Sequence, residues 1–209
     1  MPITYIIIGL TVLISMAALN NHQLFQQLKH WPYAEARRNE KYRWLTGGFL
    51  HGDNNHLFFN MLTLYFFGPA LERYFTRIVP EAPSLAFGLF YLLAIVASSL
   101  ATYVKYKDHA GFSSIGASGA TAAVLFACIL FNPTIGIMMF FIPIPIPGFI
   151  FAILYLWYSA YSADKGGDNI DHTAHYYGAV FGFVFPLVFD PYLFVSFLET
   201  ISGWISNIF

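Results

Sequence analysis

The chain has 209 residues, of which 57% are hydrophobic and only 10% are charged. Soluble domains carry roughly 25% charged residues, so this composition excludes an ordinary soluble protein and favours an integral membrane protein whose surface faces lipid. The formal net charge of −1 excludes a strongly basic nucleic-acid binder. The length suits a single domain with about six membrane spans.

Six apolar segments are expected to be membrane-spanning helices, because a span needs about 20 mostly apolar residues. In chain order they are residues 3–19, 55–74, 83–104, 117–131, 148–161 and 174–189. The first is interpreted as a retained span rather than a cleaved signal, because no basic residue precedes it. The fourth opens with small residues that allow close backbone approach, so it is expected to be central and surrounded by the others.

The segments between and after the spans carry their own signals. Residues 20–54 hold most of the charges together with Trp31 and Trp44, which predicts a structured loop at the membrane interface. The Pro-rich segment 142–147 cannot be a continuous helix and is expected to be an extended turn. In the tail, residues 191–209, apolar residues recur with helical periodicity beside a polar face. This predicts an amphipathic interfacial helix after a membrane domain of residues 1–190.

Polar residues inside a membrane are costly, so three clusters at the starts of spans are candidates for function. His56 and Asn60 are four residues apart at the start of the second span and share one helical face. Ser118 lies in the small-residue run that opens the fourth span. His175 lies near the start of the sixth span, and all three clusters enter from the same side under an alternating topology.

Two glycines predict which helices meet. Gly178 and Gly182 share a face with His175 and would let the sixth span lie backbone-to-backbone against the fourth. That packing would place His175 beside Ser118. A serine hydroxyl needs a neighbouring base to become a nucleophile, and a serine at a helix start lies among free N–H groups that can stabilise an oxyanion.

In this order and on these helices, the clusters make the chain resemble the rhomboid family of intramembrane serine proteases over nearly its whole length. The resemblance implies an all-α, six-helix membrane bundle that cleaves transmembrane segments of other membrane proteins in the lipid bilayer. It implies no cofactor, no metal and no nucleic-acid partner. The matching residues are Arg43, His51, His56, Asn60, Gly68, Glu72, Gly116, Ala117, Ser118, Gly119, Ala174, His175, Gly178 and Gly182.

The resemblance also implies roles for these residues. Ser118 and His175 would form a catalytic dyad without a carboxylate. Asn60, His56 and the Ser118 N–H would form the oxyanion hole, and Phe59 would line the substrate entrance. Arg43 and Glu72 would brace the first loop. Structural support would come from His51, Gly116, Gly119, Gly178 and Gly182.

Two positions depart from the family pattern. Many members place an aromatic ring four residues after the serine, where it stacks on the histidine, but this chain has Ala122 there. Another group must therefore hold the His175 ring. Four residues after Glu72, where glycine is common, the chain has Thr76.

Two other functions stay open at this point. A catalytically inactive rhomboid-like chaperone or adaptor would keep the fold, although such relatives usually lack the serine or the histidine. A metal-dependent membrane hydrolase or transporter would use the histidines at 51, 56, 172 and 175, although no His-Glu-x-x-His motif occurs.

The remaining polar residues receive simpler interpretations. His22, His30 and His109 are expected to be solvated, His172 to lie at the mouth of the site, and Asp164, Asp168 and Asp171 to form a hydrated loop. The resemblance implies a multi-pass protein of the bacterial inner membrane with its active site facing outward. Eight of the ten basic residues lie on the active-site side, which opposes the positive-inside tendency.

Overall fold

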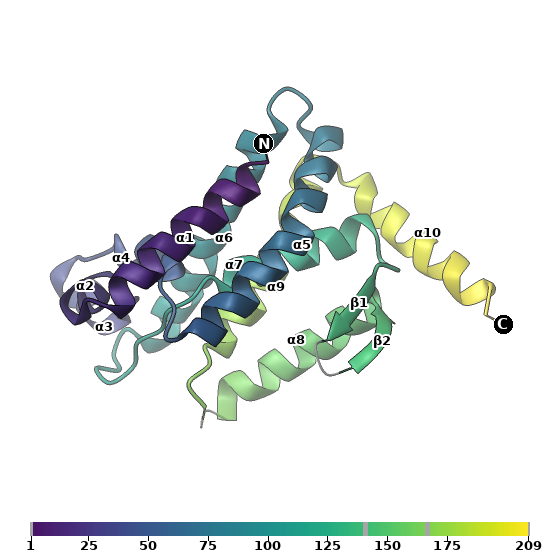
Figure 1. The fold of residues 1–209 in the computed structure, drawn as a ribbon. Helices are drawn as coiled ribbons and strands as arrows, with labels where there is room; N and C mark the ends of the chain where they lie inside the picture. The colour runs from purple at the N-terminus through teal and green to yellow at the C-terminus, as the bar shows by residue number, and fades with distance from the viewer. Residues whose placement is uncertain (1, 140–141, 166–167, 209) are drawn as a thin grey trace.

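The computed structural model of the protein describes residues 2–139, 142–165 and 168–208. Helices occur at all six positions where the sequence predicts spans (Figure 1). They are α1 (Ile3–Leu19), α5 (Asn54–Ile78), α6 (Pro83–Tyr106), α7 (Ser118–Phe131), α8 (Gly148–Lys165) and α9 (His172–Val184). The predicted positions of the helices are confirmed, with ends shifted by a few residues.

Length and hydropathy by themselves support fewer spans than six. Among the described residues, α6 is the only single helix long and apolar enough to cross a bilayer, whereas α1 and α7 are apolar but shorter. Helix α9, extended by the 3₁₀ turn η2 (Phe185–Val188), passes the same test only together with α10 (Tyr192–Ser206), and this pair is bent by 113°. The structure thus establishes a helix at each of the six predicted positions, but not six membrane crossings.

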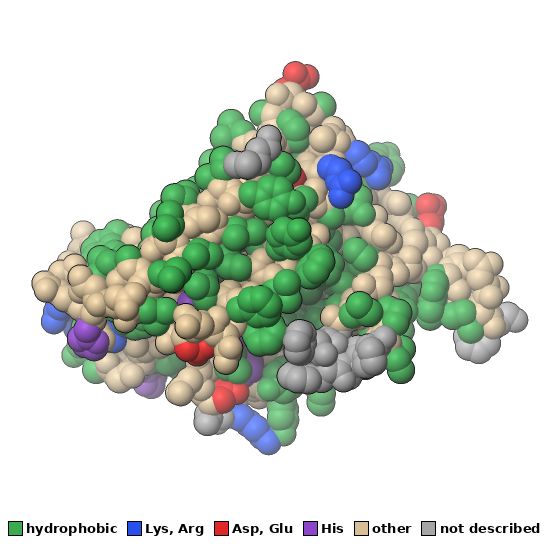
Figure 2. Space-filling view, in the orientation of Figure 1, with side chains coloured by type: hydrophobic (Ala, Val, Ile, Leu, Met, Phe, Trp, Pro, Cys, Tyr) green, Lys and Arg blue, Asp and Glu red, His purple; other side chains and the backbone are tan. Residues whose placement is uncertain are grey.

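The face of the molecule shown in Figure 2 has an apolar middle. In Figure 2, hydrophobic side chains cover most of the centre of the visible face, and charged side chains lie towards its ends. Exposed large hydrophobic residues occur on many helices, for example Leu13 on α1 and Trp157 on α8. Apolar exposure on this scale is typical of a surface that contacts a membrane.

The first loop is folded into short elements at one end of the bundle, beside the end of α1 (Figure 1). These are α2 (His22–Leu28), α3 (Pro32–Arg38), α4 (Arg43–Thr46) and the 3₁₀ turn η1 (Gly47–Phe49). The buried Arg43 guanidinium donates hydrogen bonds to the carbonyls of Gln26 and Lys29 and to the carboxylate of Glu40. The prediction of a structured loop is therefore confirmed.

The Pro-rich segment is extended, as predicted, but it belongs to a β-hairpin that the sequence pattern does not predict. Strand β2 (Ile142–Pro147) pairs antiparallel with β1 (Gly136–Met139), and Gly136 lies opposite Pro147. Proline is compatible with such a strand because both strands of a lone hairpin are edge strands. The fold is thus mostly helical rather than entirely α-helical.

Helix α7 is the buried centre of the bundle. Every residue from position 119 to position 130 is buried, and α5, α6, α8 and α9 pack around the helix. The small residues that open α7 allow neighbouring backbones to approach closely. The predicted central position of this helix is confirmed.

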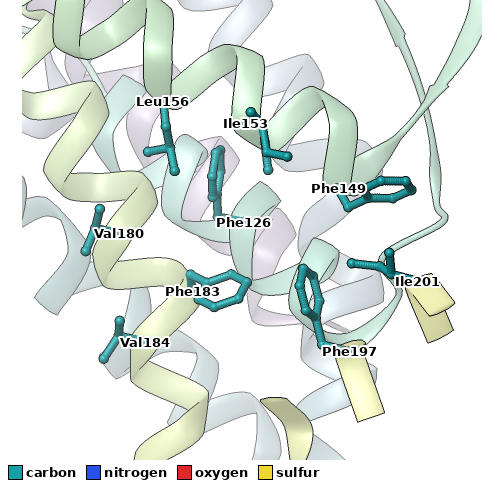
Figure 3. A pocket seen from close by; sticks show the side chains of 10 residues that line it. Phe126, Phe149, Ile153, Leu156, Val180, Phe183, Val184, Phe197 and Ile201 are labelled. Atoms are coloured by element: carbon teal, nitrogen blue, oxygen red, sulfur yellow. The ribbon is translucent and has the colours of Figure 1, made fainter. Parts of the chain in front are cut away.

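Helix α10 leaves the bundle after η2 and carries the C-terminus away from it (Figure 1). An apolar pocket of about 270 Å³ lies where α7, α8, α9 and α10 face one another. Phe126 of α7 points into this pocket between Ile153 of α8, Phe183 of α9 and Phe197 of α10 (Figure 3). The predicted tail helix exists, and its location at the membrane interface remains a prediction.

Candidate active site

Helices α7 and α9 touch backbone-to-backbone near their starts. A β-carbon on Gly178 would overlap the carbonyl oxygen of Gly119, and one on Gly119 would lie 3.1 Å from the carbonyl oxygen of Ala174. Gly119 follows Ser118 directly, and Ala174 precedes His175. The close packing predicted from the glycine spacing is confirmed. It brings together the chain neighbours of Ser118 and His175.

Ser118 is the first residue of α7 and is partly buried. It lines a polar cavity of about 20 Å³ together with Ser98, Ala174 and Asp171. The N–H of Thr121 donates to the carbonyl of Ala117 at 2.8 Å, so the amides of residues 118–120 precede the first intrahelical hydrogen bond. Amides at a helix start can stabilise a developing negative charge.

Gly116 shapes the chain just before the serine. Its φ of +118° is a conformation that residues with a β-carbon rarely adopt, and a β-carbon would also lie 2.7 Å from Cε1 of His56. The His56 ring therefore lies directly against the backbone that leads into Ser118. Only glycine both adopts this φ readily and leaves room for the His56 ring.

Asn60 connects α5 to α7 beside the serine. Its Nδ2 donates to the carbonyl of His56 at 3.0 Å, and its Oδ1 accepts from the Thr121 hydroxyl at 3.0 Å. These bonds fix the plane of the Asn60 amide and leave its second N–H available. Thr121 was not among the predicted site residues, although a hydroxyl one helical turn after Ser118 was a signal for it.

His51 is fully buried and links three segments. The Ser15 hydroxyl donates to the carbonyl of Phe49 at 2.7 Å, so Nδ1 of His51, 2.9 Å from the Ser15 oxygen, must carry the proton. Its Nε2 then accepts from the N–H of Ala117 at 3.4 Å. Burial, and secondarily the charge of His56, lower the pKa of His51 to about 3, so the ring is neutral.

His175 is held by rings from two helices. The ring of Tyr155 on α8 stacks on it, with centroids 6.2 Å apart and planes at 26°. The ring of His172 lies edge-on, with centroids 5.9 Å apart. No direct hydrogen bond between the Ser118 hydroxyl and the His175 ring occurs among the described residues. Such bonds are often long in unliganded enzymes and shorten with substrate.

The start of α9 is anchored by Asp171, which was expected to lie in a hydrated loop. Its carboxylate accepts from the N–H of Ala174 at 2.9 Å and caps the helix. It also accepts from the Thr102 hydroxyl of α6 at 2.8 Å. Helix α6 thereby fixes the end of α9 that carries His175.

His30, which was expected to be solvated, is buried, and so is His172, which was expected to lie at the mouth of the site. His30 Nδ1 lies 2.7 Å from Oε1 of Glu35, and His172 Nε2 lies 3.0 Å from Oδ2 of Asp168. A carboxylate partner offsets the loss of water around each ring. The hydrogen bond from His172 lowers the pKa of Asp168. His22 and His109 are exposed, as predicted.

Glu72 does not brace the first loop, and that prediction is wrong. Its carboxylate accepts from the N–H of Ile3 at 3.0 Å, from the Thr4 hydroxyl at 3.0 Å and from the Ser84 hydroxyl at 2.6 Å. These donors begin α1 and α6, at the end of α1 opposite the first loop. Phe59, the predicted entrance residue, is 43% exposed on α5.

A polar cavity of about 550 Å³ opens beside the candidate site. Lys29, Asp53, His56, Asp168 and Asp171 are among the residues that line it. The cavity reaches the surroundings of Ser118 through His56, which lies against Gly116, and through Asp171, which also lines the small cavity at Ser118. Within the described ranges, no three His, Cys, Asp or Glu residues are grouped as they would be around a metal ion.

The mostly helical architecture and the large apolar exposure are typical of an integral membrane protein. A family model described as the rhomboid domain matches residues 38–191. The chain therefore belongs to the rhomboid family.

Three relatives illustrate this membership. "RHOMBOID-like protein 12, mitochondrial" of Arabidopsis thaliana is 31% identical over 144 residues, which are 65% of this chain and 42% of the relative. "Rhomboid protease GlpG" of Haemophilus influenzae is 26% identical over 187 residues, 89% of this chain and 90% of the relative. The protein of the same name from Serratia proteamaculans is 26% identical over 186 residues, 87% of this chain and 60% of the relative. The chain thus spans less than two thirds of two of them.

Proposed function

We propose that the protein is a six-span intramembrane serine endopeptidase that cleaves transmembrane segments of other membrane proteins through Ser118 and His175. The observation that carries this proposal is the backbone contact of α7 and α9 at Gly119 and Gly178. This contact brings together the starts of the two helices that carry Ser118 and His175. Membership of a family with relatives named as proteases supports the same function.

The reaction follows from these two groups. Ser118 Oγ attacks the scissile carbonyl carbon while its proton passes to the His175 ring. His175 then gives that proton to the leaving amine as the C–N bond breaks, which leaves an ester on Ser118. Water then attacks the ester carbonyl carbon while His175 accepts a proton from it. As the bond between the acyl carbon and Ser118 Oγ breaks, His175 returns that proton to Oγ, which releases the carboxylic acid product and restores the serine.

The oxyanion of each tetrahedral intermediate is stabilised by three donors: the Ser118 N–H, the second Nδ2 hydrogen of Asn60 and the His56 ring. Two observations support this assignment. Asn60 is fixed by its bonds to His56 and Thr121, and the His56 ring lies against the backbone of Gly116. One donor of this kind contributes about 2.7–4 kcal/mol of transition-state stabilisation.

Water and substrate reach the site by different routes. The polar cavity of about 550 Å³ supplies water to Ser118 from one membrane face, because the lipid core contains none. The substrate helix arrives laterally past Phe59 and must unwind near that face to expose its backbone. Segments that unwind easily are therefore the preferred substrates.

In the membrane, the first-loop helices and α10 lie in the interface, and the site faces outward from a bacterial inner membrane. The cation–π contacts of Lys29 and Arg38 with Trp31 suit such an interfacial position. Reporter fusions at the carboxyl terminus test this orientation. A reporter that is active only outside the cell would contradict it.

Cleavage by the purified protein tests the function. With a model transmembrane substrate in proteoliposomes, the wild-type protein should cleave and Ser118→Ala should not. Ser113→Ala, which alters an exposed loop serine nearby, is the matched control and should cleave normally. A fluorophosphonate probe should label Ser118 in the wild-type protein. A folded wild-type protein that neither cleaves nor reacts would instead be an inactive rhomboid-like adaptor.

A further inference from the structure

The catalytic helix lacks a ring beside the proposed base. Ala122 lies one turn after Ser118 on α7 and is buried, so its methyl group is the only side-chain surface that this position offers. Ala122 belongs to an apolar cluster that also contains Phe126, and Tyr155 of α8 packs against that cluster. A ring supplied by α8 thus reaches the region that α7 leaves unfilled.

Tyr155 contacts both the base and this cluster. Its ring stacks on His175, with centroids 6.2 Å apart and planes at 26°, and meets Phe126 at 5.4 Å. On the other side of the base, His172 lies edge-on at 5.9 Å. The His175 ring therefore has one stacked neighbour and one edge-on neighbour, from two different helices.

A histidine base needs a fixed ring plane. Its side chain rotates about two bonds, and only a narrow range of orientations points a ring nitrogen at the Ser118 hydroxyl. A displacement of 1 Å in a catalytic group can lower a rate by about 100-fold. The carboxylate that orients the histidine in many serine hydrolases has no counterpart in the proposed dyad. Ring contacts must therefore supply the orientation.

We infer that Tyr155 is the positioning residue that holds the His175 ring in its catalytic orientation, in place of an aromatic residue on α7. This inference rests on the proposed Ser118–His175 dyad. Tyr155 acts through its ring face, so the phenol oxygen is not required. Because the ring comes from α8, the orientation of the base depends on how α8 is docked.

The docking of α8 rests on little surface. The buried residues of this helix are Gly148, Ala152 and Ser159, all small, and the apolar pocket of about 270 Å³ separates part of α8 from α9 and α10 (Figure 3). Phe126, which contacts Tyr155, points into that pocket. A shift of α8 would withdraw Tyr155 from His175, which makes α8 the element that controls the base.

Three substitutions, each to another apolar side chain, separate positioning from packing. Tyr155→Leu removes the ring, Tyr155→Phe keeps it, and Phe151→Leu removes a neighbouring ring of the same helix. Phe151 is the matched control because it packs against Tyr155 at 5.7 Å, whereas the described residues include no ring contact between Phe151 and His175. All three keep an apolar side chain in the cluster.

The first measurement is the rate at which a fluorophosphonate probe labels Ser118, with kcat and KM for a model transmembrane substrate. Tyr155→Leu should lower the labelling rate and kcat about tenfold with KM unchanged. Tyr155→Phe and Phe151→Leu should stay within about twofold of the wild-type protein. A normal rate in Tyr155→Leu, an equal loss in Phe151→Leu, or an equal loss in Tyr155→Phe would overturn the inference.

The second measurement does not require activity. In the Ser118→Ala background, the proton resonances of the His175 ring carry a ring-current shift from Tyr155. That shift should disappear with Tyr155→Leu and persist with Tyr155→Phe. Unchanged resonances in Tyr155→Leu would overturn the inference, whether or not the wild-type protein cleaves. A lost shift in a protein that does not cleave would support the contact and reject only the proposed protease function.

Discussion

Gly178 of α9 lies directly over the carbonyl oxygen of Gly119 of α7, so that a β-carbon on Gly178 would overlap that oxygen. The obstacle is the backbone of a buried helix, which cannot rotate away as a side chain can. The two helices are therefore held at the closest approach that glycine allows. That approach sets the separation between Ser118, which directly precedes Gly119, and His175, which lies one helical turn before Gly178.

Gly178→Ala should separate α7 from α9 and abolish cleavage. Overpacking of this kind costs about 1–3 kcal/mol, and the upper end is expected because backbone must move. Thermal unfolding in detergent and cleavage of a model substrate measure the two effects. Gly9→Ala is the control: nothing lies within 4 Å of a β-carbon at Gly9 on α1, so this variant should keep its activity. A fully active Gly178→Ala would contradict the close contact.

The hydrogen bond from Thr121 to Asn60 predicts a graded series of losses. Asn60→Ala removes a proposed oxyanion donor and should lower kcat by about 10²–10³-fold. Thr121→Val leaves the Asn60 oxygen without its donor and should lower kcat about tenfold, which is about 1.4 kcal/mol. Thr121→Ser keeps the hydroxyl and should be nearly normal. Thr200→Val, at an exposed position of α10, serves as the control. Equal rates in Thr121→Val and Thr121→Ser would remove Thr121 from this role.

Features that depend only on the spacing of residues within one helix were predictable from the sequence. The glycines at 178 and 182 share a face with His175, and the small residues of α7 follow Ser118 in an unbroken run. Helical geometry puts the residues of each pattern on the surface where the two helices can meet. The central position of α7 and its contact with α9 could therefore be predicted. These two faces bring together the helix starts that carry the proposed catalytic pair.

Features that depend on contacts between distant segments were not predictable. The β1–β2 hairpin is formed by pairing, and the ring on His175 comes from Tyr155, which is 20 residues away on another helix. His30 was expected to be solvated because the sequence does not show that Glu35 becomes its partner once α3 has folded. Glu72 was assigned to the wrong end of the bundle. Its place in the sequence of α5 does not reveal that the starts of α1 and α6 lie beside it in the folded protein.

Glu72 should contribute to stability rather than to catalysis. Glu72→Ala leaves donors at the starts of α1 and α6 without an acceptor and should destabilise the protein by about 3 kcal/mol. Glu72→Gln keeps one acceptor oxygen and should lose less. The catalytic rate per folded molecule should stay normal, because the site lies at the other end of the bundle. Glu199→Ala on the exposed face of α10 is the control. A specific loss of kcat in folded Glu72→Gln would contradict this separation.

The buried neutral ring of His51 predicts how stability depends on pH. Its pKa is about 3 in the folded protein and 6.5 in the unfolded chain, chiefly because burial disfavours the charged ring. Between these values the unfolded chain holds one more proton, so the free energy of unfolding falls by about 1.4 kcal/mol for each pH unit below 6.5. His51→Gln keeps an acceptor for the Ala117 N–H but does not titrate.

At pH 7 the wild-type protein should therefore be more stable than His51→Gln, because the neutral imidazole makes both of its hydrogen bonds. At pH 5 that difference should shrink by about 2 kcal/mol. At this pH the position 51 side chain binds a proton on unfolding only in the wild-type protein, and this favours its unfolded state. Thermal unfolding at the two pH values measures the difference. His22→Gln, at an exposed position of α2, should follow the wild-type curve closely. A difference between wild type and His51→Gln that stays constant from pH 7 to pH 5 would show that His51 titrates normally. The neutral His51 ring would then not connect Ser15 of α1 to the N–H of Ala117 as described.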